Sequence, residues 1–109
     1  QDTFQSGRAS EDETSATITA ELARSSELLC PHSAVGVKVA NALRDPATPM
    51  ITLATAHPAK FPDAVEAATG IRPPLPPRMA DLYDRPERVT RISNDLAALE
   101  AFVRGQIRH

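Results

Sequence analysis

The segment LATAHPAKF, residues 53–61, places several side chains that can do chemistry directly after an apolar run. Thr55 carries a hydroxyl that can donate one hydrogen bond and accept others. It follows the run at the position where open α/β sheets bind ligands, in the crevice at the carboxyl ends of the strands. His57 and Lys60 come within the next five residues. From these residues alone, the simpler interpretation is that Thr55 and His57 satisfy backbone groups of a loop.

Metal binding and nucleophilic catalysis find weaker support in the sequence. The only soft or borderline metal ligands are Cys30, His32, His57 and the terminal His109. A Cys-x-His pair with one distant histidine is not an established ligand spacing. Cys30 and His32 also lack a third group that would orient them as a nucleophile and its base, so we expect a structural thiol. We therefore expect no metal site and no nucleophile.

The composition is that of one small domain with little core material. The chain has 109 residues, of which 41% are apolar but only 4% aromatic, and ten are proline. It has room for one domain, and we expect either a fold of marginal stability or a fold that packs against another surface. The formal net charge is −2, without a basic stripe clear of acidic residues, so no nucleic-acid partner is expected.

The sequence also bears on location. A single cysteine excludes an internal disulfide and fits a reducing compartment, so we expect a cytoplasmic protein. No uncharged run approaches the roughly 20 residues that span a bilayer, and no signal-peptide pattern is present, so no membrane partner is expected. The chain begins at Gln1 rather than methionine, as either a piece of a longer protein or a processed chain would.

Two helices are expected before the segment that carries Thr55. Ser10 and Glu13 have the spacing of a capping box, which predicts the start of a helix over 10–25. Pro31 suits the first position of a second helix over 31–44, where its missing N–H costs nothing. Apolar residues cover most of the circumference of this second helix, which predicts that it is deeply buried.

Two more helices are expected after that segment, over 61–69 and over 94–107. Ser93 or Asn94 is expected to cap the last helix, which carries an apolar stripe. Within the earlier helix over 31–44, Gly36 lets a neighbouring part of the chain come close.

The apolar run MITLA, residues 50–54, is bounded by turn signals and is typical of a strand buried on both faces. A strand needs neighbours, and this chain offers only one weak candidate, residues 88–93. The expected fold class is therefore α/β, mostly helical with one or two short strands. The shortage of strands is the first indication that the fold depends on residues outside this chain.

Residues 71–77 contain RPPLPP, which predicts an extended, polyproline-like connector. The same tract, with its flanking arginines, has the P-x-x-P spacing that proline-recognition domains bind. A small helical interaction module that binds through RPPLPP is therefore the alternative to a part of an enzyme. A product of gene decay without a function of its own is a third possibility. The basic residues at 85, 88 and 91 alternate with acidic ones and predict a solvated face.

Several segments together resemble one enzyme family. ATAHPAKFPDAV is similar to the late signature of threonine synthase, and CPHSAVGV resembles the DPHTAVGV segment that precedes it in that family. GRASEDETSATI and DLAALEAFV resemble an earlier acidic helix start and the C-terminal helix. These segments agree in order and spacing over nearly the whole chain. The resemblance implies the C-terminal segment of the cofactor-binding domain of a fold type II pyridoxal-phosphate enzyme.

The resemblance also implies an activity. The parent enzyme, a carbon–oxygen lyase, would convert O-phosphohomoserine and water to threonine and phosphate with pyridoxal phosphate as cofactor. The implied partner is the N-terminal remainder of that enzyme. The Schiff-base lysine would lie in that remainder, because neither Lys38 nor Lys60 matches its motif. No catalytic residue is expected in this chain, and the isolated 109 residues should be inactive.

The resemblance assigns one cofactor contact. Thr55 is similar to the residue that hydrogen-bonds the pyridine nitrogen, and His57 and Lys60 belong to the same signature as a second layer around the site. One residue departs from the family pattern, because Cys30 stands where aspartate is expected directly before Pro31. An aspartate there would cap the second helix, so its loss should cost about 1 kcal/mol of local stability.

Overall fold

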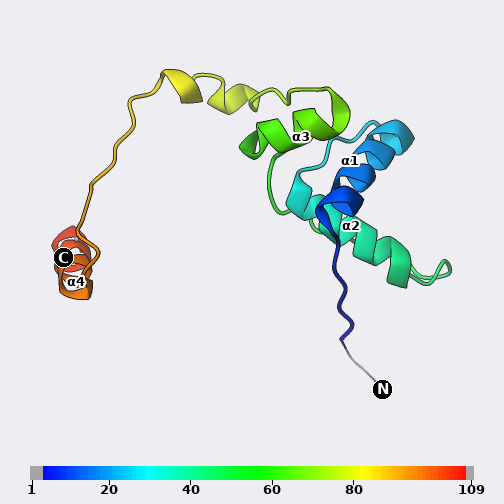
Figure 1. Ribbon diagram of the computed structural model, residues 1–109, viewed down its shortest axis with the longest axis horizontal. Coiled ribbons are helices and arrows are strands. Elements are labelled where there is room, and N and C mark those ends of the chain that lie inside the picture. The colour runs from blue at the N-terminus through cyan, green and yellow to red at the C-terminus, as the bar shows by residue number, and fades with distance from the viewer. Residues whose placement is uncertain (1–3, 108–109) are drawn as a thin grey trace.

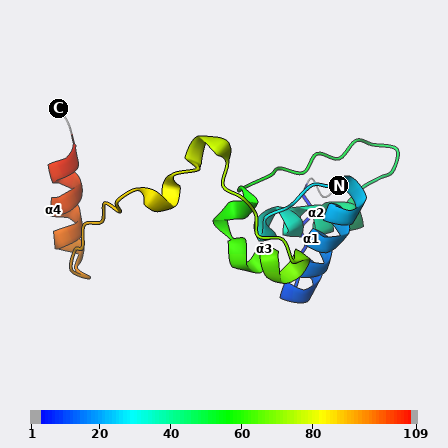
Figure 2. The same ribbon diagram turned by 90° about the horizontal axis from the view of Figure 1, so that it is seen from above.

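The structure is a computed structural model that describes residues 4–107, and it consists of helices joined by extended segments (Figure 1). Its α-helices are α1 (Glu11–Ser25), α2 (Pro31–Leu43), α3 (Pro62–Thr69) and α4 (Leu96–Gln106). Three single-turn 3₁₀-helices are η1 (Pro58–Lys60), η2 (Pro77–Met79) and η3 (Leu82–Asp84). α1 packs against both α2 and α3 to form a three-helix unit, and α4 lies apart from that unit (Figures 1 and 2).

The start of α1 has the predicted capping box. The Ser10 backbone N–H donates to Glu13 Oε2 at 2.8 Å, and the Glu13 N–H donates to Ser10 Oγ at 3.2 Å. Lys38 of α2 forms an ion pair with Glu13 at 3.0 Å, so this helix start is also tied to the next helix. The hydrogen bond from the Ser10 backbone, followed by the contact with Lys38, lowers the pKa of the Glu13 carboxyl.

Prolines and a glycine mark other helix boundaries. Pro31 and Pro62 each occupy the first turn of their helix, and Gly70 ends α3 with a left-handed φ of 73° that favours glycine. At α4 the predicted cap was wrong, because Asp95 caps the helix in place of Ser93 or Asn94. Its Oδ2 accepts the Ala98 N–H at 2.9 Å.

The core of the three-helix unit is small. Ile18 of α1, Val65 of α3 and Ala34 of α2 are almost completely buried. The Thr19 hydroxyl adds a polar link from α1 to α3 by donating to the Ala68 carbonyl at 2.8 Å. Few large side chains are buried, as the low aromatic content predicts.

The predicted deep burial of the second helix was wrong for this chain. In α2 only Ser33 and Ala34 are buried, residues 35–40 are half-buried and residues 41–43 are exposed. The reason is that, within residues 4–107, α1 is the only helix that packs extensively against α2. The apolar circumference of α2 is therefore only partly covered.

The predicted strand over 50–54 was also wrong, as was the weaker candidate over 88–93. The part of the chain that the structure describes contains no strand, and both segments run without backbone pairing. A strand needs a neighbouring backbone to satisfy its N–H and C=O groups, and this chain does not bring one alongside. Residues 50–54 instead run past α2 near Gly36, where an added Cβ would come to 3.1 Å from Thr52 Cγ2.

The chain as a whole is extended. Its radius of gyration is 19.3 Å and its dimensions are 53 × 42 × 27 Å. A compact domain of this length would have a radius of gyration of about 13 Å. The extra length comes from the segment between η3 and α4, which carries α4 away from the three-helix unit (Figures 1 and 2). No helix within the described range is both long and apolar enough to cross a membrane.

The burial pattern predicts the effect of two matched substitutions. Ile18→Val should lower the free energy of unfolding by about 1 kcal/mol, because it removes a methylene from a closed core. Ile18 is 1% exposed and Ile51 is 85% exposed. Ile51→Val should therefore change stability by less than about 0.5 kcal/mol. Urea unfolding followed by far-ultraviolet circular dichroism measures both, and equal losses would show that the assigned core is wrong.

Candidate functional site

A hydrogen bond of its backbone fixes the position of Thr55. Its N–H donates to Ser33 Oγ at 3.2 Å, and Ser33 is buried in the first turn of α2. The Thr55 side chain is exposed, and its hydroxyl makes no hydrogen bond to any other residue in the range 4–107. By contrast, the hydroxyls of Thr17 and Thr69 donate to carbonyls of their own helices. The Thr55 backbone is thus held in place, and its hydroxyl is left available for an outside partner.

His57 acts on the local backbone. Its Nδ1 accepts the Ala59 N–H at 3.1 Å and so caps η1. An accepting Nδ1 requires the neutral ring with its hydrogen on Nε2, so Nε2 remains a donor. This contact confirms the simpler interpretation of the sequence for Nδ1, because this atom satisfies a backbone group of the loop.

Lys60 is exposed and lies beside aromatic rings. Its Nζ is 5.6 Å from the centroid of the Phe61 ring, within the range of a cation–π contact. The Phe61 ring in turn packs on the His32 ring, with centroids 4.7 Å apart. These contacts hold the segment that follows Thr55 against the start of α2.

Thr55, His57 and Lys60 all line one hollow of about 360 Å³. Its other wall is apolar and comes from the connector and the turns after it, through Leu75, Pro76, Met79 and Leu82. An apolar hollow with a few polar groups at one side is typical of small-molecule sites. The structure thus brings the three predicted residues together.

Sequence reasoning missed both this apolar wall and Ser33. The signal for the wall was Leu75, a large apolar side chain in the middle of the tract that was interpreted as a connector or as a P-x-x-P ligand. Ser33 left a weaker signal, as a small polar residue in the first turn of an otherwise apolar helix.

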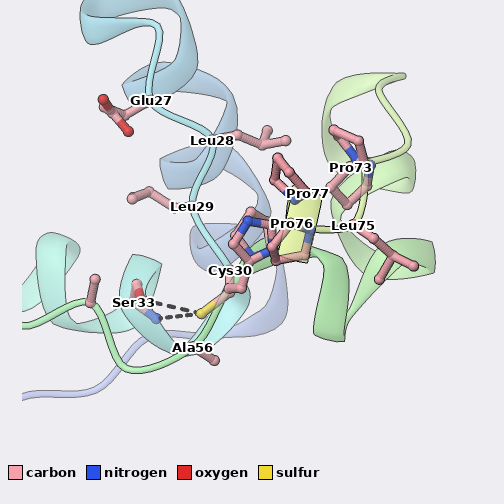
Figure 3. Close-up of a pocket in the computed structure, with 14 residues that line it drawn as sticks. Glu27, Leu28, Leu29, Cys30, Ser33, Ala56, Pro73, Leu75, Pro76 and Pro77 are labelled. Carbon is pink, nitrogen blue, oxygen red and sulfur yellow. Dashed lines mark hydrogen bonds between the residues drawn. The ribbon is translucent and has the colours of Figure 1, made fainter. Parts of the chain in front are cut away.

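A second hollow of about 660 Å³ lies next to the first, between the start of α2 and the proline connector (Figure 3). Cys30, Ser33, Ala56 and Pro76 are among its lining residues. In Figure 3 the Cys30 sulfur points toward Ser33. The Ser33 N–H donates to this sulfur at 3.4 Å, and the Ser33 hydroxyl lies 3.2 Å from it.

Cys30 therefore caps α2 itself. The helix begins at Pro31 as predicted, because the sulfur accepts the Ser33 N–H that an aspartate before Pro31 was expected to cap. Burial raises the pKa of the Cys30 thiol, but hydrogen bonds from the Ser33 side chain and from the backbone of Ser33, His32 and Ala56 lower it by more. The net pKa lies below the ordinary value of 9.0.

The proline connector packs against the three-helix unit. Pro73 is buried and Pro76 is half-buried. Arg72 donates to Asp63 Oδ1 at 3.0 Å and to Glu66 Oε2 at 2.6 Å, which fixes the connector to α3. A P-x-x-P ligand needs its prolines and its flanking arginine on a free surface. This packing gives no support to the alternative of an interaction module that binds through RPPLPP.

Within the described residues no group of three or more histidine, cysteine, aspartate and glutamate side chains is placed to hold a metal ion. The candidate site is formed by the Thr55 hydroxyl, two nitrogen-bearing side chains and an apolar wall.

Comparison with known proteins identifies the family. A family profile described as "Threonine synthase, C-terminal" matches residues 33–103. This chain belongs to the threonine synthase family. It is 48% identical over 102 residues to threonine synthase of Pseudomonas aeruginosa, covering 92% of this chain and 22% of the relative. It is 40% identical over 101 residues to threonine synthase of Corynebacterium glutamicum, covering 92% and 21%.

A solved structure agrees with this family. Pyridoxal-phosphate-bound threonine synthase from Brucella melitensis superimposes on 94% of this chain with a TM-score of 0.82 and 51% sequence identity. The superimposed part is 22% of that chain, so this chain spans about a fifth of the length of the threonine synthases it matches. The superposition confirms the expected fold class, a mostly helical piece of such an enzyme, apart from the strands.

The surroundings of Cys30 predict a pH effect on stability. Because the thiol pKa is lowered in the folded chain, the unfolded chain binds more protons at pH values between the two pKa values. The free energy of unfolding should therefore rise with pH through that window, and the gain should be lost as pH falls through the folded pKa. Thiolate absorbance in the ultraviolet gives the folded pKa, and urea unfolding at about pH 7 and about pH 9.5 gives the stability.

Cys30→Ser is the matched control, because serine keeps a capping oxygen but does not titrate in this range. The free energy of unfolding of Cys30→Ser should not rise between the two pH values, because no group at position 30 then loses a proton. If the wild type and Cys30→Ser show the same pH dependence, the lowered pKa of the thiol is refuted.

Proposed function

We propose that this chain is the C-terminal part of a pyridoxal-phosphate-dependent threonine synthase that converts O-phosphohomoserine and water to threonine and phosphate. The family membership and the superposition on a pyridoxal-phosphate-bound threonine synthase support this proposal. The observation that carries it is that Thr55, His57 and Lys60, from the family signature, line one hollow. The activity belongs to the complete enzyme, and the 109 residues alone are proposed to be inactive.

The hollow suits the pyridine ring of the cofactor. Its volume of about 360 Å³ is at the small end of ligand pockets, as fits one part of a divided site. Leu75, Pro76 and Met79 offer an apolar wall to the ring, and Thr55, which lines the hollow with His57 and Lys60, offers a hydroxyl to the ring nitrogen. The hydroxyl can pair with a ring nitrogen as donor, which makes Thr55 the proposed cofactor-binding residue.

The choice of a hydroxyl affects the electronic state of the ring. A carboxylate beside the nitrogen would favour its protonated form, whereas a neutral hydroxyl does not strongly do so. When bound, the cofactor supplies the electron sink that the reaction needs. The role of Thr55 is to hold the ring nitrogen and to limit how much positive charge it carries.

The residues around Thr55 hold its backbone and its loop in one place. Ser33 holds the Thr55 N–H, and Cys30 lies against Ser33 at the start of α2. His57 caps η1 immediately after Thr55, and Lys60 lies over Phe61. We assign His57 and Lys60 to a second layer that orders the loop and places a cation near the hollow.

The remainder of the enzyme is the proposed partner. It would supply the Schiff-base lysine and the groups that bind the substrate, which this chain does not contain. We propose a cytoplasmic enzyme, in keeping with a single cysteine that serves as a helix cap and not in a disulfide.

Substitution of Thr55 tests the cofactor contact in a complete enzyme. The suitable protein is a chimeric enzyme in which this chain replaces the matching C-terminal part of the Pseudomonas aeruginosa threonine synthase. Thr55→Val keeps the shape of the side chain but removes the hydroxyl, and kcat for phosphate release from O-phosphohomoserine should fall about 10-fold to 100-fold. Thr55→Ser keeps the hydroxyl and should stay within about fivefold of the wild type.

Thr48→Val is the matched control, because Thr48 lies in the exposed turn after Asp45 and does not line the hollow. It should leave phosphate release and the absorbance spectrum of the bound cofactor unchanged. If Thr55→Val releases phosphate as fast as the wild type with an unaltered cofactor spectrum, the proposed role of Thr55 is wrong.

A further inference from the structure

The C-terminal arm, which we define as residues 85–107, exposes most of its apolar side chains. Residues 81–97 are all exposed. On α4, the side chains of Leu96, Leu99, Phe102 and Val103 are between 36% and 70% exposed. In Figures 1 and 2, α4 lies at the far end of an extended segment, away from the three-helix unit. This is a large apolar surface for so short a segment.

The apolar side chains of α4 form one stripe. Leu96, Leu99 and Val103 recur at helical spacing, with Phe102 beside them, and we call these four residues the α4 stripe. Glu100 and Arg104 form an exposed ion pair at 3.2 Å along one flank. The helix thus has one side suited to packing and another suited to water.

α4 is also too short to be stable by itself. It has 11 residues, whereas isolated helices shorter than about 12–15 residues are marginal in water. Most helices of this length depend on a packed apolar face. Within the described range, α4 makes no extensive contact with another helix, so the surface that stabilises it must come from elsewhere.

The comparison with the Brucella melitensis enzyme indicates where that surface is. The superposition covers 94% of this chain and so leaves out only about seven residues. The superimposed residues therefore include most or all of α4. The extended arrangement is therefore shared with a complete threonine synthase, in which the matching part is only 22% of the chain. The rest of that polypeptide is the material available to fill the space beside α4.

We propose that the α4 stripe docks on the N-terminal remainder of the threonine synthase, so that the C-terminal arm clamps the three-helix unit and its Thr55 onto that remainder. This inference rests on the proposed function in one respect, because it takes the chain to be part of a longer enzyme. The segment before α4 suits a clamp. Arg85 forms two hydrogen bonds with Asp81, at 2.9 and 2.6 Å. Pro86 fixes its own φ and favours the extended backbone that Arg85 adopts before it, so the arm leaves η3 in a defined direction.

Hydrogen exchange of the α4 amides tests the clamp. The two samples are this chain alone and the chimeric enzyme described above. Docking predicts that α4 exchanges at least about 100-fold more slowly in the chimeric enzyme, because opening then requires separation of a packed interface. Equal exchange rates in the two samples would overturn the proposal. Protection in this chain alone that increases with its concentration would also overturn it, because a second copy would then cover the stripe.

Two lysine substitutions in the chimeric enzyme test the assigned face. Leu99→Lys places a charge in the α4 stripe and should speed α4 exchange at least about tenfold. Ala101→Lys is the matched control, since a shift of two positions places its side chain on the opposite side of the helix, and its effect should be less than about threefold. If Leu99→Lys does not fold, Leu99→Ala gives the same comparison against the unsubstituted enzyme. Equal effects of the two lysine variants would refute the stripe as the docking face.

The two experiments can refute the clamp and the cofactor contact independently of each other. Thr55→Val should leave α4 exchange unchanged while it slows phosphate release. Unprotected α4 in an enzyme whose phosphate release depends on Thr55 would refute the clamp alone. Protected α4 in an enzyme that is indifferent to Thr55→Val would refute the cofactor contact alone.

Discussion

The hydrogen bond from the Thr55 N–H to the Ser33 hydroxyl is the contact on which the candidate site depends. It joins a loop to the first turn of a helix 22 residues earlier, and its acceptor is buried, so water competes with it little. Ser33 also lies against the Cys30 sulfur, so the same residue takes part in the helix cap and in the placement of the loop. With the backbone held in this way, the Thr55 side chain can present its hydroxyl without using it.

Three apolar features of this chain are left wholly or partly without a packing partner among residues 4–107. Residues 50–54 are apolar and extended but lack a backbone partner in the described range, and α2 is covered chiefly by α1. α4 exposes an apolar stripe. Each of these features exposes apolar side chains to water, which has an unfavourable free energy. All three have one explanation in a chain that spans about a fifth of the threonine synthases it matches.

The family was predictable from the sequence because its signature segments are local. ATAHPAKFPDAV and CPHSAVGV each occupy one loop and one helix start, and the structure brings both to the same place. The family resemblance did not reveal how Cys30 compensates for an aspartate, because a thiol is a weak acceptor whose capping role appears only in its contacts with Ser33. It also did not reveal Leu75 and Met79 as a wall of the hollow, since their position depends on how the connector folds back.

The sequence by itself determined the helix boundaries that depend on groups a few residues apart. The Ser10–Glu13 capping box, the prolines at the first turns of α2 and α3, and Gly70 after α3 act over one turn and need no other part of the chain. Only the tertiary structure decided that 50–54 is not a strand, that α2 is half-covered and that α4 stands apart. Backbone pairing and burial depend on partners distant in sequence, and an apolar pattern predicts that a partner is needed without specifying which chain segment supplies it.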